Sequence, residues 1–236
     1  MSDQTVALVT GANKGIGKAI AKGLARRGII VLLGSRDKER GEQTAAELAN
    51  DGIVKVLKLD VNDENSIKSA SFFVDKNFGK LDILVNNAGI ATTRDPPSSV
   101  TAEAMRAVYE TNVFGVVGVT HAFLPLLKQS AAGRIVNVSS LRGSLGDEGA
   151  FVGQPSMPYS TSKTALNALT VHYSRELAAF GIKVNSAAPG HVATDFNGFR
   201  GTRTPAEGAA IAIRLATLPI DGPTGGFFDD NGPITW

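Results

Sequence analysis

Cysteine is missing from this chain of 236 residues. Its absence excludes disulfide bonds, thiolate metal sites and cysteine nucleophiles. The 24 basic and 22 acidic residues form no block of five like charges, so we expect no nucleic-acid partner. The apolar run 29–33 is far too short to span a membrane, and the start of the chain lacks the basic and apolar segments of a signal peptide. We therefore expect a cytoplasmic protein with no membrane partner.

Histidine is also scarce, and its positions do not suggest a metal site. His121, His172 and His191 have no metal-ligand spacing, and no cysteine is available to complete a site. We expect His121 and His172 to be structural. His191 follows a Pro-Gly turn, which would place it at the edge of an active site near that turn, but a lone histidine is more often an ordinary packed or surface residue.

The composition, with 43% hydrophobic and 19% charged residues, is typical of a globular protein with a sizeable core, and the length favours one domain over residues 1–236. Short apolar runs alternate with segments of helical periodicity. This alternation predicts an α/β fold: a single Rossmann-type, doubly wound parallel sheet of about seven strands with helices on both faces. We predict strands at 6–9, 30–33, 54–59, 83–85, 135–138 and 184–187, and helices at 15–27, 38–50, 64–78, 101–127, 158–180 and 206–216.

A glycine-rich segment, TGANKGIG, joins the first strand to the first helix. Gly11, Gly15 and Gly17 would let the backbone turn sharply and approach a pyrophosphate, whose negative charge suits the N-terminus of a helix. The spacing GxxxGxG differs from GxGxxG, and an ordinary strand-to-helix turn also uses glycine. The glycines alone therefore do not distinguish a phosphate loop from an ordinary turn, and the evidence must come from neighbouring residues.

The end of the second strand bears on which cofactor would bind. Folds that prefer NAD place an Asp or Glu there for the ribose 2′-hydroxyl, whereas this chain reads LLGSRD, with Ser35 followed by Arg36. Arg36 and Lys14 of the glycine loop are two cations that would suit the 2′-phosphate of NADP. The alternatives are that both are solvated loop charges, or that Asp37 turns in to bind a ribose.

Tyr159 and Lys163 form a YxxxK pair on one face of a predicted helix. A phenol has a pKa of about 10, and a nearby ammonium favours the phenolate. Lys163 is therefore expected to lower the pKa of Tyr159 towards working pH, where the phenol can serve as a general acid or base. The helix follows a strand that ends in Ser139 and Ser140, which places candidate hydrogen-bond donors beside the phenol.

Six motifs stand in order along the chain: TGANKGIG, NNAG, TNVFG, NVSS, YSTSK and Pro-Gly at 189–190. With them the chain resembles the short-chain dehydrogenase/reductase family over essentially its whole length. The resemblance implies that Tyr159 donates the proton, that Lys163 binds the nicotinamide ribose and tunes Tyr159, and that Ser140 holds the substrate oxygen. Asn112 would hold a water that passes protons onward. Ser139 is the structural alternative to Ser140.

The resemblance also implies a set of cofactor contacts. From the residues alone, Asp60 reads as a helix cap and Asn86 as part of a turn. In the family pattern both line the cofactor, together with the remaining positions: Gly11, Asn13, Lys14, Gly15, Ile16, Gly17, Ser35, Arg36, Val61, Ala88, Gly89, Tyr159, Lys163, Pro189, Gly190, Val192 and Thr194.

Within the family the chain looks like NADPH-dependent carbonyl reductases, which implies NADP(H) as cofactor and a small carbonyl compound as substrate. It lacks the long insertion that monomeric animal carbonyl reductases carry before the tyrosine, so we expect a homodimer or homotetramer, with the helix before Phe180 and the C-terminal segment as candidate interfaces. The short segment between Thr194 and Pro205 suggests an open site with a broad ketone range. The alternatives are an NAD-linked alcohol or sugar-alcohol dehydrogenase, and a non-catalytic NADP-binding regulator.

Overall fold

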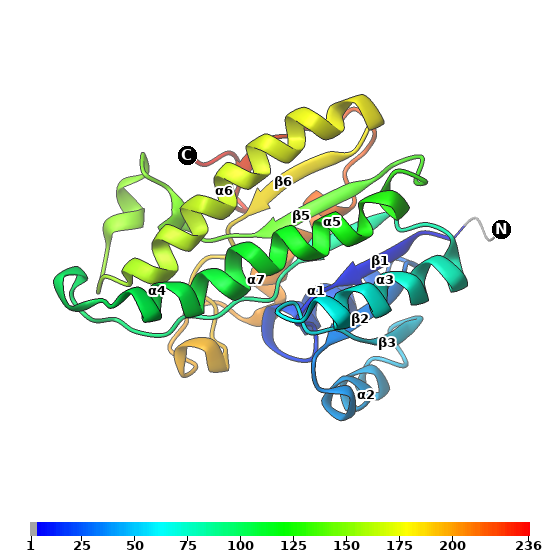
Figure 1. The fold of residues 1–236 in the computed structure, drawn as a ribbon, viewed down its shortest axis with the longest axis horizontal. Coiled ribbons are helices and arrows are strands. Elements are labelled where there is room, and N and C mark those ends of the chain that lie inside the picture. Colours follow the sequence, from blue (N-terminus) through cyan, green and yellow to red (C-terminus); the bar gives the residue numbers. More distant parts are fainter. Residues whose placement is uncertain (1–3) are drawn as a thin grey trace.

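The computed structural model describes residues 4–236 and contains one seven-stranded parallel sheet, with strand order β3-β2-β1-β4-β5-β6-β7 (Figure 1). The predicted doubly wound α/β fold is confirmed. Six strands lie within two residues of their predicted bounds, because each is a short run rich in apolar residues; all but the edge strand β3 are buried along nearly their whole length. The strands are β1 (Val6–Val9), β2 (Ile30–Ser35), β3 (Val54–Lys58), β4 (Ile83–Asn86), β5 (Arg134–Val138), β6 (Lys183–Ala187) and β7 (Phe227–Phe228).

Helices cover both faces of the sheet, and most begin at a side chain that caps the free amides. Asp37, Asp63, Thr101 and Thr204 accept hydrogen bonds from the first turns of the helices that follow them. The helices are α1 (Gly15–Ala25), α2 (Lys38–Glu47), α3 (Glu64–Phe78), α4 (Ala102–Tyr109), α5 (Gly115–Leu127), α6 (Met157–Leu177) and α7 (Pro205–Ala216).

Alternating side chains of the strands build two separate cores. On β1, Ala7 and Val9 pack with α1 and α7 on one face, whereas Val6 and Leu8 pack with α3 and α5 on the other. Figure 1 shows α3, α5 and α6 on the same side of the sheet, over this second face. This division follows from the period of two along a strand.

The predicted helix 101–127 is wrong in one respect: it is not continuous α-helix. Five residues, Glu110–Phe114, form a π-helical turn between α4 and α5. The whole stretch Ala102–Leu127 is long and apolar enough to cross a membrane by length and composition, but 56% of its most apolar window is buried inside the protein. This burial is typical of a core helix, and the π turn places Asn112 in the interior.

The strand order brings two loops together at the carboxyl edge of the sheet. β1 pairs with β2 on one side and with β4 on the other, so the chain winds in opposite directions from this point. In such sheets the crevice between the diverging loops is where ligands bind. The loops that follow β1, β2, β4, β5 and β6 therefore define the region to search for a site.

Candidate active site

The loop after β1 is tied to the loop after β4 by Thr10 and Asn87, two residues that the sequence analysis did not single out for this purpose. The buried Thr10 hydroxyl accepts hydrogen bonds from the backbone amides of Asn87 and Ala88, each at 3.0 Å. The Asn87 side-chain amide donates to the carbonyls of Thr10 and Gly11 at 2.9 and 3.1 Å. These bonds fix the position of the glycine loop.

The glycines of this loop are required by its geometry. Gly11 and Gly15 have φ of +60° and +54°, a conformation that favours glycine. A Cβ on Gly17 would lie 2.5 Å from the Gly11 carbonyl oxygen and closer still to the Asn87 amide. Lys14 precedes α1 without a side-chain cap, so the amides of this helix end are free to bind a phosphate.

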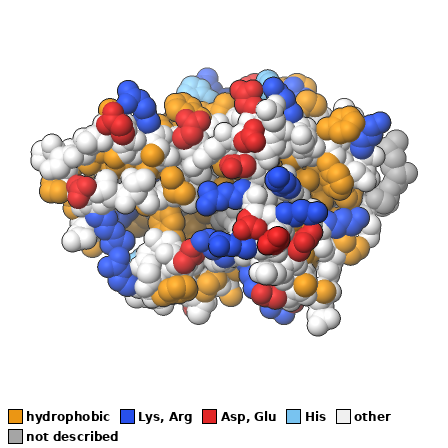
Figure 2. Space-filling view, turned by 60° about the horizontal axis from the view of Figure 1, so that its bottom comes forward, with side chains coloured by type: hydrophobic (Ala, Val, Ile, Leu, Met, Phe, Trp, Pro, Cys, Tyr) orange, Lys and Arg blue, Asp and Glu red, His pale blue; other side chains and the backbone are white. Residues whose placement is uncertain are grey.

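A cavity of about 520 Å³ opens beside the glycine loop. Two ion pairs form between residues of its lining, Lys14 with Asp195 and Lys18 with Glu47. Figure 2, which brings the lower side of Figure 1 forward, shows basic and acidic side chains interspersed on this face. The cavity is lined by Asn13, Lys14, Gly15, Lys18, Arg40, Gln43, Thr44, Glu47, Ala193, Thr194, Asp195, Phe199 and Pro205.

Asp37, the acid that follows β2 in the chain, already has a structural role. Asp37 accepts a hydrogen bond from the Arg40 amide at 3.1 Å and pairs with the Arg40 guanidinium at 3.2 Å, as the N-cap of α2. The buried Ser35 hydroxyl donates to the Asp37 carbonyl at 2.7 Å, and Arg36 is exposed. The arrangement disfavours Asp37 as a ribose ligand.

Asp60 and Asn86 use their side chains within the fold. The Asp60 carboxylate accepts from the Asn62 amide at 3.0 Å, and the Asn86 amide donates to Asn137 at 2.9 Å and to Thr120 at 3.3 Å. Only their backbone and surface atoms remain to contact a ligand. Val61 is partly buried and packs against the core, where it limits the space at Gly115.

Gly89 lies next to the groups expected to do chemistry. A Cβ at Gly89 would be 3.3 Å from the Asn112 side-chain oxygen and 3.6 Å from the Lys163 nitrogen. A Cβ at Gly11 would likewise be only 3.0 Å from the Cα of Ala88. The backbone of the segment after β4 thus runs between the glycine loop and Lys163.

Tyr159 and Lys163 lie on successive turns near the start of α6, as predicted from their spacing. The Lys163 nitrogen is 5.6 Å from the centre of the Tyr159 ring and donates to the Val138 carbonyl at 2.7 Å. Lys163 is buried, and burial lowers the pKa of its ammonium to about 8.

The pKa of Tyr159 does not follow the sequence-based expectation. Burial raises the pKa of the phenol above its ordinary value, while Ser140 and the charge of Arg142 act to lower it. The ammonium of Lys163 is not the cation responsible, because it points to the Val138 carbonyl. The prediction that Lys163 lowers the pKa of Tyr159 is therefore wrong for the protein without cofactor. Ser140 and Arg142 are the groups that offset the effect of burial on this pKa.

The two serines after β5 have different surroundings. The Ser139 hydroxyl is buried and donates to the side-chain oxygen of Asn167 at 2.7 Å. Ser140 is half-buried, accepts from the Arg142 amide at 3.3 Å and interacts with Tyr159. Of the two hydroxyls, only that of Ser140 faces the phenol.

Asn112 is fully buried in the π turn, and its side chain is occupied by protein groups. Its oxygen accepts from the Ile90 amide at 2.8 Å, and its nitrogen donates to the Ile90 carbonyl at 2.9 Å and to Ser162 at 3.0 Å. Ser162 in turn donates to the Tyr159 carbonyl at 2.7 Å. Asn112 therefore links the loop after β4 to the helix that carries the tyrosine.

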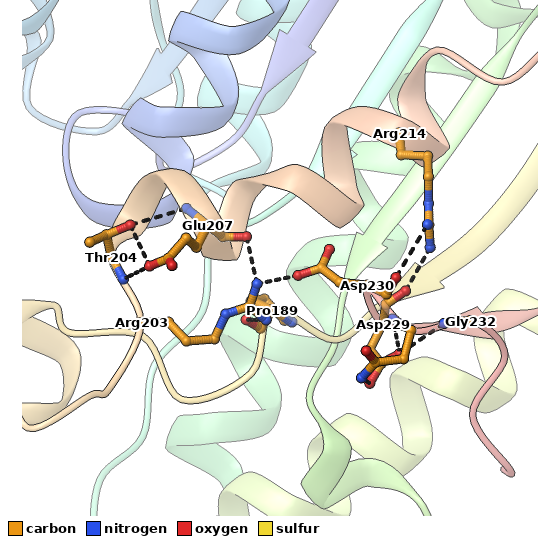
Figure 3. A network of polar contacts seen from close by, with 9 residues as sticks. Pro189, Arg203, Thr204, Glu207, Arg214, Asp229, Asp230 and Gly232 are labelled. Atoms are coloured by element: carbon orange, nitrogen blue, oxygen red, sulfur yellow. Dashed lines mark hydrogen bonds and ion pairs between the residues drawn. The ribbon is translucent and has the colours of Figure 1, made fainter.

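The Pro189–Gly190 turn after β6 is held by Arg203, which the sequence analysis missed. The Arg203 guanidinium donates to the carbonyls of Pro189 and Glu207 at 2.9 and 3.0 Å, and it pairs with Asp230 (Figure 3). Gly190 has φ of +78°, and the guanidinium leaves little room for a side chain there. One arginine thus joins the turn, α7 and the C-terminal segment.

The segment after this turn covers the tyrosine. Val192 pairs with Arg203 in a short bridge, and Thr194 is buried with its methyl group facing Gly15. The Phe196 ring packs on the Tyr159 ring at 5.4 Å between centres, tilted by 57°. Among residues 4–236, no three His, Asp or Glu side chains gather as a possible metal site.

Comparisons with known proteins agree with this geometry. The model of the family described as short chain dehydrogenase matches residues 5–204. A short-chain dehydrogenase of Penicillium roqueforti is 39% identical over 225 residues, with 89% of this chain and 87% of the relative covered. Carbonyl reductase [NADPH] 1 of Bos taurus is 34% identical over 281 residues, with 100% of this chain and 99% of the relative covered.

Solved structures show the same architecture. The NADPH-bound carbonyl reductase from chicken fatty liver superposes with a TM-score of 0.89 at 29% identity, covering 99% of both chains. Salutaridine reductase of Papaver somniferum superposes with a TM-score of 0.82 at 34% identity, covering 96% of this chain and 100% of that one. Both similarities extend over nearly the whole chain.

Proposed function

Because this chain belongs to the short chain dehydrogenase family and is thus an oxidoreductase, we propose that it reduces aldehyde or ketone carbonyls to alcohols with NADPH. The observation that carries the proposal is the meeting of Tyr159, Lys163 and Ser140 beside the glycine loop at the carboxyl edge of the sheet. A protein that only bound a nucleotide would not need a phenol, an ammonium and a hydroxyl in this place.

NADP(H) fits the residues present. The glycine loop leaves no room for a side chain at Gly17, as a backbone cradle for a pyrophosphate requires. Lys14 and Arg36 would hold the 2′-phosphate, and the capping role of Asp37 disfavours this carboxylate as a ligand of the 2′-hydroxyl of NAD. The name of the cattle relative, carbonyl reductase [NADPH] 1, includes NADPH, and the chicken carbonyl reductase was solved with NADPH bound. Both support NADP(H) as the cofactor of this chain.

The bound cofactor supplies the hydride, and the protein handles the carbonyl oxygen and the proton. Ser140 and Tyr159 hydrogen-bond the oxygen and stabilise its developing negative charge, and Tyr159 then donates its proton. The raised pKa of Tyr159 keeps the phenol protonated and ready to donate. Lys163 would bind the nicotinamide ribose, and Asn112 would hold a water that passes protons onward.

The proposed contacts with the rest of the cofactor follow the loops around the crevice. Asp60 and Val61 would contact the adenine. The backbone atoms of Asn86, Ala88 and Gly89 would line the cofactor. Pro189, Gly190, Val192 and Thr194 would position the nicotinamide. The rigid hold of Arg203 on the Pro189 carbonyl supports this last role.

Two other functions remain as alternatives. An NAD-linked alcohol or sugar-alcohol dehydrogenase would use the same catalytic groups, but Lys14 and Arg36 argue against NAD as the preferred cofactor. A non-catalytic NADP-binding regulator would usually have lost one of the catalytic positions, and here all four are filled. We further propose a cytoplasmic location, a homodimeric or homotetrameric assembly and an open site with a broad ketone range.

The test is to follow the absorbance of NADPH or NADH with a panel of α-keto esters, aryl ketones and small aldehydes. We expect faster turnover with NADPH, loss of at least about 10²-fold in Tyr159→Phe, and little change in the control Tyr173→Phe, whose ring packs against the core on the same helix. Tight NADPH binding without turnover of any substrate would instead support the regulator. A steep preference for one small aldehyde would refute the broad range.

A further inference from the structure

Asp195 lies against the glycine loop although 181 positions separate it from Lys14, with which it forms an ion pair. The turn that carries Asp195 is well defined. The buried Asn197 side chain accepts from the Thr194 amide at 3.3 Å, and the Thr194 carbonyl accepts from the Phe199 amide at 2.8 Å. The position of the carboxylate beside Lys14 therefore follows from a hydrogen-bonded turn.

The cations that line the cavity are already neutralised. Each has a carboxylate partner within the protein: Lys14 with Asp195, Lys18 with Glu47, and Arg40 with Asp37. A phosphate dianion gains less from a cation that keeps a carboxylate partner than from a free one, because it must displace that carboxylate from the cation. Of these acids, only Asp195 comes from the segment after β6 that also covers Tyr159.

We propose that Asp195 is a specificity-determining residue that competes with the 2′-phosphate of NADP(H) for Lys14. Because NAD(H) lacks that phosphate, the competition weakens binding of NADP(H) alone and narrows the difference between the two cofactors. This inference rests on the proposed function, in which Lys14 binds the 2′-phosphate. It makes the native chain less selective for NADP(H) than its cations would otherwise allow.

The test measures dissociation constants of NADPH and NADH by fluorescence titration, which requires no turnover. The variants are Asp195→Asn, Lys14→Met and the double variant. Asp195→Asn should bind NADPH about five-fold more tightly, the scale of one exposed ion pair, and NADH as before. In the Lys14→Met background the same substitution should change neither constant, because the cation for which Asp195 competes is gone.

The control for net charge is Glu64→Gln, which removes an exposed acid at the start of α3 and should leave both constants unchanged. Unchanged NADPH binding in Asp195→Asn would overturn the inference, as would equal tightening for NADH or equal tightening in the Lys14→Met background. If Lys14→Met binds NADPH as tightly as the native chain, the cofactor assignment itself fails. The two failures are thus distinguishable.

Discussion

Replacing Gly17 by alanine should destabilise the protein, although alanine is the better helix former. Gly17 lies in α1 with ordinary helical backbone, where the change from glycine to alanine alone would stabilise by about 1 kcal/mol. The added methyl group would lie 2.5 Å from the Gly11 carbonyl oxygen and 3.0 Å from the Ala12 Cα, both backbone atoms. The loop and Asn87 must therefore move.

The size of the effect can be estimated from the contacts that are lost. Overpacking costs about 2 kcal/mol, and the two hydrogen bonds of the Asn87 amide contribute about 1 kcal/mol each. After subtraction of the helix term, the free energy of unfolding should fall by about 3 kcal/mol. For a chain of this length that corresponds to a decrease of about 10 °C in the melting temperature.

The assay is thermal unfolding followed by circular dichroism, with NADPH titration on the same samples. The matched control is Gly118→Ala in α5, where the new methyl group would meet only the flexible end of Ile67 at 3.3 Å. This control should melt at the native temperature or above it, and Gly17→Ala should also lose NADPH affinity. A Gly17→Ala protein that melts with the control and binds NADPH normally would refute the reasoning.

Three further predictions concern single side chains. The pKa of Lys163 is lowered from 10.5 to about 8 in the folded protein, so between these two pH values unfolding takes up a proton. The free energy of unfolding should therefore rise by up to about 3 kcal/mol as the pH increases from 8 to 10.5. Denaturant titrations should show this rise in the native chain and not in Lys163→Met. Arg203→Met should raise the KM for NADPH more than Asp230→Asn does, because only the former frees the Pro189 carbonyl; equal steady-state values would contradict this. Because the Phe196 ring packs on Tyr159, an aryl substrate held at Tyr159 would contact it, and Phe196→Leu should lower kcat/KM for aryl ketones about 3- to 10-fold relative to aliphatic ketones, the scale of one aromatic contact. An unchanged ratio would show that Phe196 does not contact the aryl group.

The fold was largely predictable because its strands are short apolar runs and its helices have clear periodicity. What was missed has physical reasons. β7 has only two residues, Phe227–Phe228, and lies in a segment rich in glycine and proline. The π turn cannot be read from hydrophobic spacing, because residues 113–119 are all apolar or glycine and so hide a shift of one residue in the helical register.

The site was predictable in its composition but not in its contacts. The family motifs indicated Tyr159, Lys163 and Ser140, and the structure brings them together. The contacts of Arg203 and Asp195 join positions far apart in the chain, which no local pattern reveals. The direction of the Tyr159 pKa depends on burial, which exists only once the protein has folded.

The π turn also has a consequence for how the length of this helix can change. A helix advances by about 100° per residue, so deleting one residue from Glu110–Phe114 would turn α4 by that angle relative to α5. Asn112 would leave Ile90, and α4 would lose its register against its neighbours. A surface loop absorbs an insertion or deletion by bending, whereas here the gain or loss of one codon would reorient the site. We therefore expect length variation among descendants of this chain to avoid this segment.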